Sequence, residues 1–228
     1  MRISKTALLV GVLGLLLAAV GCTQEVSGSA LPDPTAAPLA LSADGYGIVA
    51  GFDDAPVQIE IFAEPQCTHC RDLQYDFGEQ LAYYITVGSI QVTYRPLTFL
   101  DDDYDGYSSA VVNALFLAAE PVGEAAATGT QFQRFVENLW VNQEIRGPAF
   151  SGKELRDMAI SAGLPNAVAD NIQRREDAVD ISAMEEANFE LLFGIDPIRT
   201  GTPTVYDLKA GDKLDVHDAD WLAKLIES

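Results

Sequence analysis

Residues 57–73 read VQIEIFAEPQCTHCRDL, and this run carries the strongest structural pattern in the chain. Its first part alternates apolar and polar residues from Val57 to Ile61, which is the two-residue period of a β-strand. After a short turn, Cys70 opens an apolar series at helical spacing that continues through Leu73, Phe77 and Leu81. We therefore predict a strand followed directly by a helix, with a Cys-x-x-Cys pair at the helix N-terminus.

The position of the cysteine pair predicts its chemistry. A helix N-terminus presents unpaired amides and a partial positive charge, which stabilise the thiolate of the first cysteine, Cys67. Cys70 lies one turn into the helix, close enough to form a small disulfide ring but less open to incoming thiols. We expect Cys67 to be the attacking sulfur and Cys70 the resolving one.

Further strands and a helix are expected on either side of this unit. A second strand is predicted from Ile90 to Leu97 and a third near Val205, just after Gly201-Thr202-Pro203. Residues 213–216 are expected to pair back on the third strand as a hairpin. A closing helix is expected over about 219–227.

Together these segments resemble the DsbA-like thioredoxin-fold oxidoreductases, on the motifs Asp54-Ala55-Pro56-Val57, Cys67-Thr68-His69-Cys70 and Gly201-Thr202-Pro203. The resemblance covers about 46–100 and 195–228. It implies an α/β thioredoxin fold in which Pro203 is cis and faces the cysteine pair. It also implies that Thr68, Thr202 and Pro203 contact substrate peptide, and that the Cys67–Cys70 redox disulfide serves without a further cofactor.

The segment between these ends has a helical pattern from Tyr107 to about Gly194. Apolar stripes recur there at helical spacing, most simply as core. They include Val111, Leu115 and Ala118; Phe132, Phe135, Val136, Leu139 and Trp140; Leu155, Met158, Ala159 and Ala162; and Ile181, Met184 and Leu191. We predict a helical subdomain inserted over about 107–194, as members of the DsbA-like family carry.

The N-terminal residues resemble an export signal. Arg2 and Lys5 precede an apolar run from Ala7 to Val20, which is shorter than the roughly 20 residues of a membrane-spanning helix. The run ends in Ala19-Val20-Gly21-Cys22, which resembles the lipobox of bacterial lipoproteins and implies lipidation of Cys22. A simple secretory signal is the alternative. We expect a signal peptide over 1–21, a flexible tether over 22–44 and the folded domain over 45–228.

Composition narrows the classes of function. The chain has 34 acidic against 14 basic residues, a net charge of −20, so it repels phosphate backbones and we expect no nucleic-acid partner. Three cysteines are too few for a disulfide scaffold. Outside the cytoplasm, where the export signal would place the protein, disulfides form and persist.

Other interpretations of the motifs remain open. A structural Cys67–Cys70 disulfide would close too short a ring to restrict the unfolded chain much. Metal binding by Cys67, His69 and Cys70 lacks a fourth soft ligand. Asp101, Asp103 and Asp105 match the opening of a calcium loop, but its twelfth position is Val112 rather than Glu. These acids more simply cap the helix that begins near Tyr107.

One departure from the family concerns proton transfer. Thioredoxin-fold enzymes often carry a buried acid six positions before the first cysteine, and here that position is Ile61. Glu60 and Glu64 have the opposite strand parity and are expected to point elsewhere. The group that moves protons is thus left unassigned.

The leading functional hypothesis is an envelope-anchored oxidant of exported proteins. His69 beside Cys67 would stabilise the reduced form and make the disulfide a stronger oxidant. Reduced or misfolded exported proteins are the expected partners, with a membrane or quinone-linked oxidant for recycling and a lipid anchor at the membrane. The alternatives are a reductase or isomerase kept as the dithiol, or a binding module whose helical subdomain holds clients.

Overall fold

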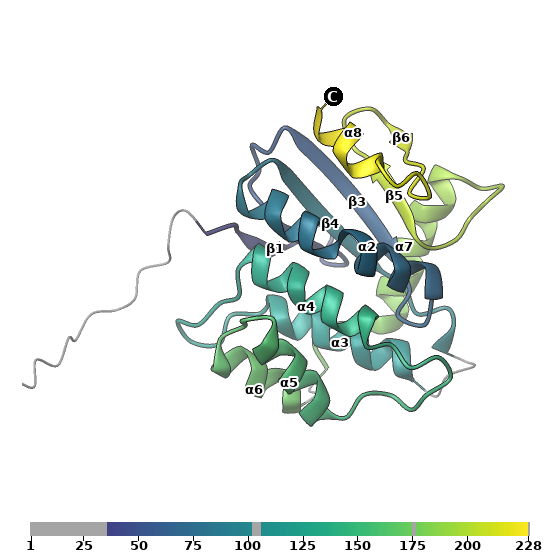
Figure 1. Cartoon of the computed structure of the whole chain (residues 1–228). Coiled ribbons are helices and arrows are strands. Elements are labelled where there is room, and N and C mark those ends of the chain that lie inside the picture. Colours follow the sequence, from purple (N-terminus) through teal and green to yellow (C-terminus); the bar gives the residue numbers. More distant parts are fainter. Residues whose placement is uncertain (1–35, 102–105, 175–176, 228) are drawn as a thin grey trace, which may run out of the picture. The chain divides into compact units, whose positions relative to one another are not determined.

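The computed structural model describes residues 36–101, 106–174 and 177–227. They form a six-stranded mixed sheet in the order β1-β2-β4-β3-β5-β6 (Figure 1). The two central strands, β3 (Val57–Ala63) and β4 (Ile90–Pro96), are parallel, and all other pairs are antiparallel. The connection between these parallel strands is α2 (Thr68–Thr86), which gives the predicted strand, helix, strand unit.

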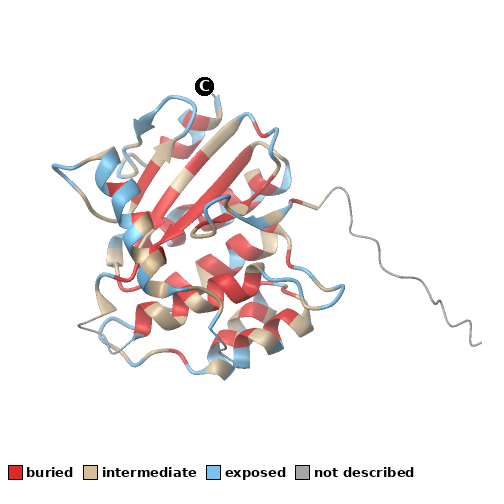
Figure 2. Cartoon of the chain, turned by 180° about the vertical axis from the view of Figure 1, so that it is seen from behind, coloured by how far each residue is buried: buried red, intermediate tan, exposed pale blue. Residues whose placement is uncertain are grey.

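Helices cover both faces of the central strands. Ile59 and Ile61 on β3 pack in the main core, to which α2 and α8 (Trp221–Glu227) contribute buried side chains. Phe62 has the opposite parity, and with Leu97 it packs against Leu192 of α7 (Ile181–Ile195). Figure 2 shows α7 lying across this second face. All seven residues of β4 are buried, as expected for a strand covered on both sides.

The predicted helical insert is present. It contains α3 (Tyr107–Ala119), α4 (Gly129–Val141), α5 (Gly152–Ser161), α6 (Asn166–Arg174) and α7. α4 runs alongside α2 (Figure 1). Capping boxes at Thr128 and Ser151 define the starts of α4 and α5, where they satisfy amides that the helix itself leaves free. Most residues of the predicted stripes are buried, although Leu191 is exposed.

At the C-terminal end the predicted strand is β5 (Thr204–Asp207), and its partner β6 covers only Asp212–Lys213. The hairpin is therefore shorter and begins earlier than expected. The last contact between the two segments is the hydrogen bond from the Leu214 amide to the Val205 carbonyl at 2.8 Å. The chain leaves β5 after this residue, so β6 stays short. The closing helix begins at Trp221, two residues later than predicted.

The folded part begins before residue 45, so the predicted limit of the tether was wrong. β1 (Leu39–Leu41) pairs with β2 (Ile48–Ala50) at the sheet edge. The carbonyls of Ala37 and Pro38 accept hydrogen bonds from the amides of Gly129 and Gly51, at 2.8 and 3.0 Å. Because backbone groups make these contacts, no apolar pattern in the sequence marks the start of the folded part. The predicted signal peptide, Cys22 and most of the tether lie outside the described residues. Within the described part, no helix is long and apolar enough to cross a membrane.

Candidate active site

The cysteine pair lies where β3 leads into α2. Cys67 is the N-cap residue of α2 and is half-buried, whereas Cys70 is fully buried inside the first turn. Both are free thiols. Cys67 is therefore the more accessible of the two sulfurs, and its role as the attacking sulfur stays a prediction.

The environment of Cys67 favours its charged form. Its pKa falls to about 6, chiefly because the Cys70 thiol donates to the sulfur, and the backbone N–H groups of Cys70 and His69 add to the effect. Burial opposes the shift. Cys67, the N-cap residue of α2, makes no side-chain capping hydrogen bond. A thiolate at this position is favoured by the amides that the helix leaves free, as a capping oxygen would be.

Cys70 is held in the opposite state. Burial raises its pKa well above the ordinary value, and hydrogen bonding to Cys67 acts in the same direction. The pKa values of the two sulfurs therefore shift in opposite directions, because one sulfur lies at the helix terminus and the other in the core. This difference is what a nucleophile with a resolving group requires.

The loop before β5 closes the site on another side. The Thr202–Pro203 peptide bond is cis, as the family resemblance implied. In its protonated form, the Cys67 thiol donates to the backbone carbonyl of Thr202 at 3.2 Å. Residues 135 positions apart thus meet at the reactive sulfur.

A buried carboxyl group lies beside the pair, and the sequence prediction for it was wrong. Glu64 is fully buried, and burial raises its pKa to about 7, while hydrogen bonds from the Ser108 hydroxyl and the Gln66 amide oppose the shift. Cys67 is among the charges that raise it. Strand parity failed because β3 ends at Ala63, so Glu64 already belongs to the turn. Glu60 does point elsewhere, to Arg95 at 2.9 Å.

The helical insert holds the turn that carries Glu64 and Cys67. The Trp140 indole N–H donates to the Glu64 carbonyl at 3.2 Å. The Gln143 side-chain amide donates to the carbonyls of Pro65 and Cys67, the second at 3.3 Å. These contacts, together with the Ser108 hydroxyl, come from α3, from α4 and from the loop that follows α4.

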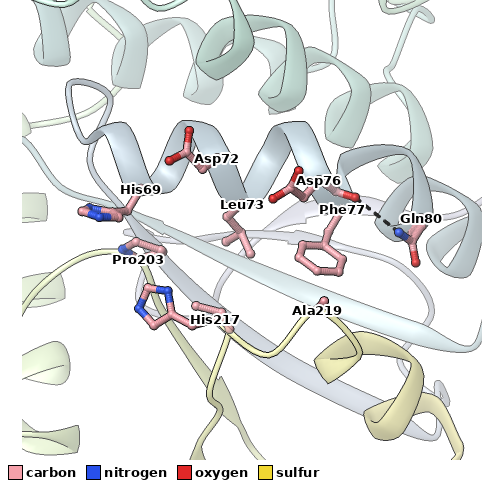
Figure 3. A pocket seen from close by; sticks show the side chains of 10 residues that line it. His69, Asp72, Leu73, Asp76, Phe77, Gln80, Pro203, His217 and Ala219 are labelled. Carbon is pink, nitrogen blue, oxygen red and sulfur yellow. Dashed lines mark hydrogen bonds between the residues drawn. The ribbon is translucent and has the colours of Figure 1, made fainter.

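His69 lies on the exposed side of the pair. Its ring makes an edge-to-face contact with the ring of His217, with the centroids 6.3 Å apart. Figure 3 shows the two rings on either side of Pro203, in a cavity of about 460 Å³ that Asp72 and Asp76 also line. His69 acts on the Cys67 sulfur through its backbone N–H. Tuning by its imidazole stays a prediction.

A second, more apolar hollow of about 440 Å³ opens on the other side of Cys67. Thr68 and Thr202 line it, with apolar walls from Phe99, Ile145 and Phe189. These three apolar side chains are 42 to 50% exposed, well above the usual exposure of large apolar residues. Two of the three predicted peptide-contact residues, Thr68 and Thr202, thus lie beside an apolar surface next to Cys67, whereas Pro203 lines the first cavity.

The calcium candidate is only partly visible. Asp103 and Asp105 lie outside the described residues. The Asp101 carboxylate accepts from the backbone amides of Ser108 and Ser109 at 2.6 and 2.9 Å, which is the helix-capping role given as the simpler interpretation. Among the residues that the structure describes, no group of three or more His, Cys, Asp or Glu side chains is placed to hold a metal ion.

This arrangement defines a DsbA-like thioredoxin fold, and solved structures share it. MdbA of Corynebacterium matruchotii, a thiol-disulfide oxidoreductase, matches with a TM-score of 0.67 and 19% identity, covering 84% of this chain and 92% of that one. MdbA of Corynebacterium diphtheriae gives 0.64 and 22%, covering 82% and 93%. DsbA of Mycobacterium tuberculosis in its oxidised form gives 0.54 and 20%, covering 84% and 91%.

Sequence comparison gives the family. A family model described as thioredoxin matches residues 43–190, and the chain belongs to this family. The curated relatives that match include the serine/threonine-protein kinase PknE of Mycobacterium tuberculosis, 27% identical over 189 residues. The match covers 79% of this chain but only 31% of the kinase, so the chain spans about a third of that relative's length.

The sequence motifs indicated both sulfurs and the proline loop, but strand parity directed Glu64 away from the site, Trp140 was expected only in the core, and Gln143 was missed. One sign of Glu64 was available, since an acid directly after a buried strand and three residues before a reactive cysteine must lie close to it. No local pattern in the sequence indicates Trp140 or Gln143, because their hydrogen bonds join residues that are 76 positions apart in the chain.

Proposed function

We propose that this protein is an extracytoplasmic thiol-disulfide oxidase that transfers the Cys67–Cys70 disulfide to reduced exported proteins. The observation that carries the proposal is the contrast between the two sulfurs: Cys67 is half-buried at the N-terminus of α2, where its pKa is lowered, and Cys70 is buried in the first turn, where its pKa is raised. The Thr202 carbonyl and the apolar hollow next to Cys67 supply a place for the client peptide.

The reaction begins from the enzyme disulfide. A client thiolate attacks the Cys67 sulfur, the Cys67–Cys70 bond breaks, and a client–Cys67 mixed disulfide forms while Cys70 leaves with the electron pair. A second client thiolate then attacks the client sulfur of the mixed disulfide and releases Cys67 as a thiolate. The client loses two electrons to form its disulfide, and the enzyme gains them as a dithiol.

Glu64 is suited to supply the proton that Cys70 needs as it leaves. The raised pKa of Cys70 means that this sulfur must be protonated, and the Glu64 carboxyl group is buried beside the pair with a pKa of about 7. A group that is half protonated near neutral pH both gives and regains a proton readily. Glu64 would thus transfer the proton in place of the acid that the family often carries at the position of Ile61.

The direction of transfer follows from the stability of the dithiol form. A low pKa at Cys67 stabilises the reduced enzyme, which makes its disulfide a stronger oxidant. A measured reduction potential far above thioredoxin's value of about −270 mV is expected, and a potential near that value would instead indicate a reductase or isomerase. Recycling then requires an oxidant, and a membrane or quinone-linked one fits a protein anchored through Cys22.

The test uses a reduced, unfolded protein as substrate. Cys67→Ser should abolish its oxidation, and retained activity would overturn the proposal. Cys70→Ser should instead be mixed with a disulfide-containing client, where the Cys67 thiolate attacks the client disulfide and releases one client thiolate. Mixed disulfides on Cys67 should then accumulate, visible on non-reducing gels, because the resolving sulfur is gone. A variant with both changes that still bound the client as tightly, while wild type formed no mixed disulfide, would favour a binding module.

A further inference from the structure

The loop after α4 contacts the reactive cysteine through one side chain, Gln143. Its Nε2 group donates to the Pro65 carbonyl and to the Cys67 carbonyl, the latter at 3.3 Å. Gln143 is 8% exposed; its bond to the Pro65 carbonyl is buried and its bond to the Cys67 carbonyl is partly buried. A single amide thereby holds two carbonyls on either side of Gln66.

The chemistry of the contacts fixes the orientation of the Gln143 amide. Two carbonyl oxygens need a donor, so the NH2 end must face them and the oxygen must face away. That oxygen, Oε1, is buried with no hydrogen-bond partner in the described part of the chain. Leaving a buried acceptor unpaired is costly. An apolar side chain would avoid this cost, so glutamine here is explained by the bonds that it donates and not by packing.

The Cys67 carbonyl belongs to the first peptide unit of α2. It also accepts the Arg71 amide at 3.2 Å, which is the first helical hydrogen bond of α2. The amides of His69 and Cys70 that face the Cys67 sulfur follow in the same turn. The direction of this carbonyl therefore determines how the sulfur sits relative to those amides.

We propose that Gln143 is a positioning residue for the nucleophilic sulfur: it holds the Cys67 carbonyl so that the amides at the start of α2 stay directed at Sγ. The inference rests on the proposed function and deepens it. The insert thus sets the reactivity of a sulfur that belongs to the thioredoxin-like part.

The test changes Gln143 to methionine, which keeps the length and shape of the side chain but removes the donors. In the reduced full chain, thiolate absorbance near 240 nm is followed against pH. The acid dissociation constant of the Cys67 thiol should fall roughly three- to tenfold, the factor that one or two hydrogen bonds contribute. The equilibrium constant with glutathione should shift by a similar factor toward the enzyme disulfide.

Gln133→Met is the matched control. Gln133 is also a buried glutamine of the insert whose Nε2 bonds to α2, to Gln74 Oε1 at 2.8 Å and the Gly78 carbonyl at 3.2 Å, but farther along the helix. Its replacement should lower the melting temperature and leave the Cys67 titration unchanged.

The outcomes separate the roles. A titration that moves in Gln143→Met but not in Gln133→Met supports positioning, whereas an unchanged titration in Gln143→Met, or an equal shift in both, overturns it. If Gln143→Met does not fold, Gln143→Asn, which is too short to reach both carbonyls, must show the same direction of shift. A wild-type Cys67 that titrates like an ordinary thiol would instead count against the proposed function itself.

Discussion

The thioredoxin-like part and the helical insert contribute different things to the site. The strands and α2 supply the two cysteines and the Thr202–Pro203 loop, and these are the groups that the sequence motifs predict. The insert supplies the polar partners of the turn between them: Ser108, Trp140 and Gln143. The insert is therefore part of the site's chemistry and more than a cover over it. Substitutions in each region can test whether the insert contributes to the reaction in this way.

The largest effect is expected from Glu64→Gln, because Glu64 joins the two regions. Its carboxyl group lies beside the cysteines and accepts from Ser108 of the insert. Loss of the ionisable group should slow client oxidation roughly 100-fold, the low end of acid–base contributions. It should also flatten the pH dependence near 7.

Glu137→Gln is the control for that change. The pKa of Glu137 is also raised, mainly by burial, but its side chain lies against Gly78 rather than the cysteines. Stopped-flow rates from pH 5 to 9 should be normal for this variant. An equal loss in both variants would mean that Glu64 has no special place in the reaction.

A second prediction concerns stability in the oxidised protein, where Cys67 no longer titrates. Burial, the largest cause of the raised pKa of Glu64, remains in the oxidised protein, whereas the Cys67 charge that adds to the value of about 7 in the dithiol protein is absent. Stability should therefore be highest below the ordinary value of 4.5 and fall as pH rises toward 7, by at most about 3 kcal/mol from this group. Urea unfolding at several pH values would measure the fall. Glu64→Gln should lack this component, and an identical pH slope in both proteins would refute it.

The smallest effect is expected from Ser108→Ala, which tests the contribution of the insert alone. The Ser108 hydroxyl lowers the pKa of Glu64, so its removal should raise that pKa. The midpoint of the pH–rate profile should move upward by roughly half to one unit, as one lost hydrogen bond implies. Ser109→Ala is the control, since Ser109 bonds to Asp101 instead. A downward shift in Ser108→Ala would contradict the assignment.

The same division explains what could be predicted from the sequence. Local periodicity was enough for β3, α2 and β4, because each of these elements repeats apolar residues at its own spacing. The cysteine pair and the proline loop have recognisable motifs. Polar contacts between the insert and the turn have no period and join residues far apart in the chain, so only the fold reveals them.

Strand parity failed at Glu64 for a related reason. Alternation holds only while the backbone stays extended, and β3 ends one residue earlier, at Ala63. The start of the domain was misjudged because the three-residue strand β1 is held by backbone groups, which carry no side-chain pattern. Both errors occurred at the ends of elements, where hydrogen bonds to the rest of the fold decide the path.

The entry of the chain into the fold determines how the domain would respond to mechanical load. Leu39 lies opposite Ala50, which pairs with Val92, whereas the reactive turn follows Ala63 at the other end of the parallel strands. In Figure 1, β1 and the start of α2 accordingly lie on opposite sides. A pull on the N-terminal side would first strain the bonds of Ala37 and Pro38 and then peel off β1. These contacts lie away from the turn that carries Cys67.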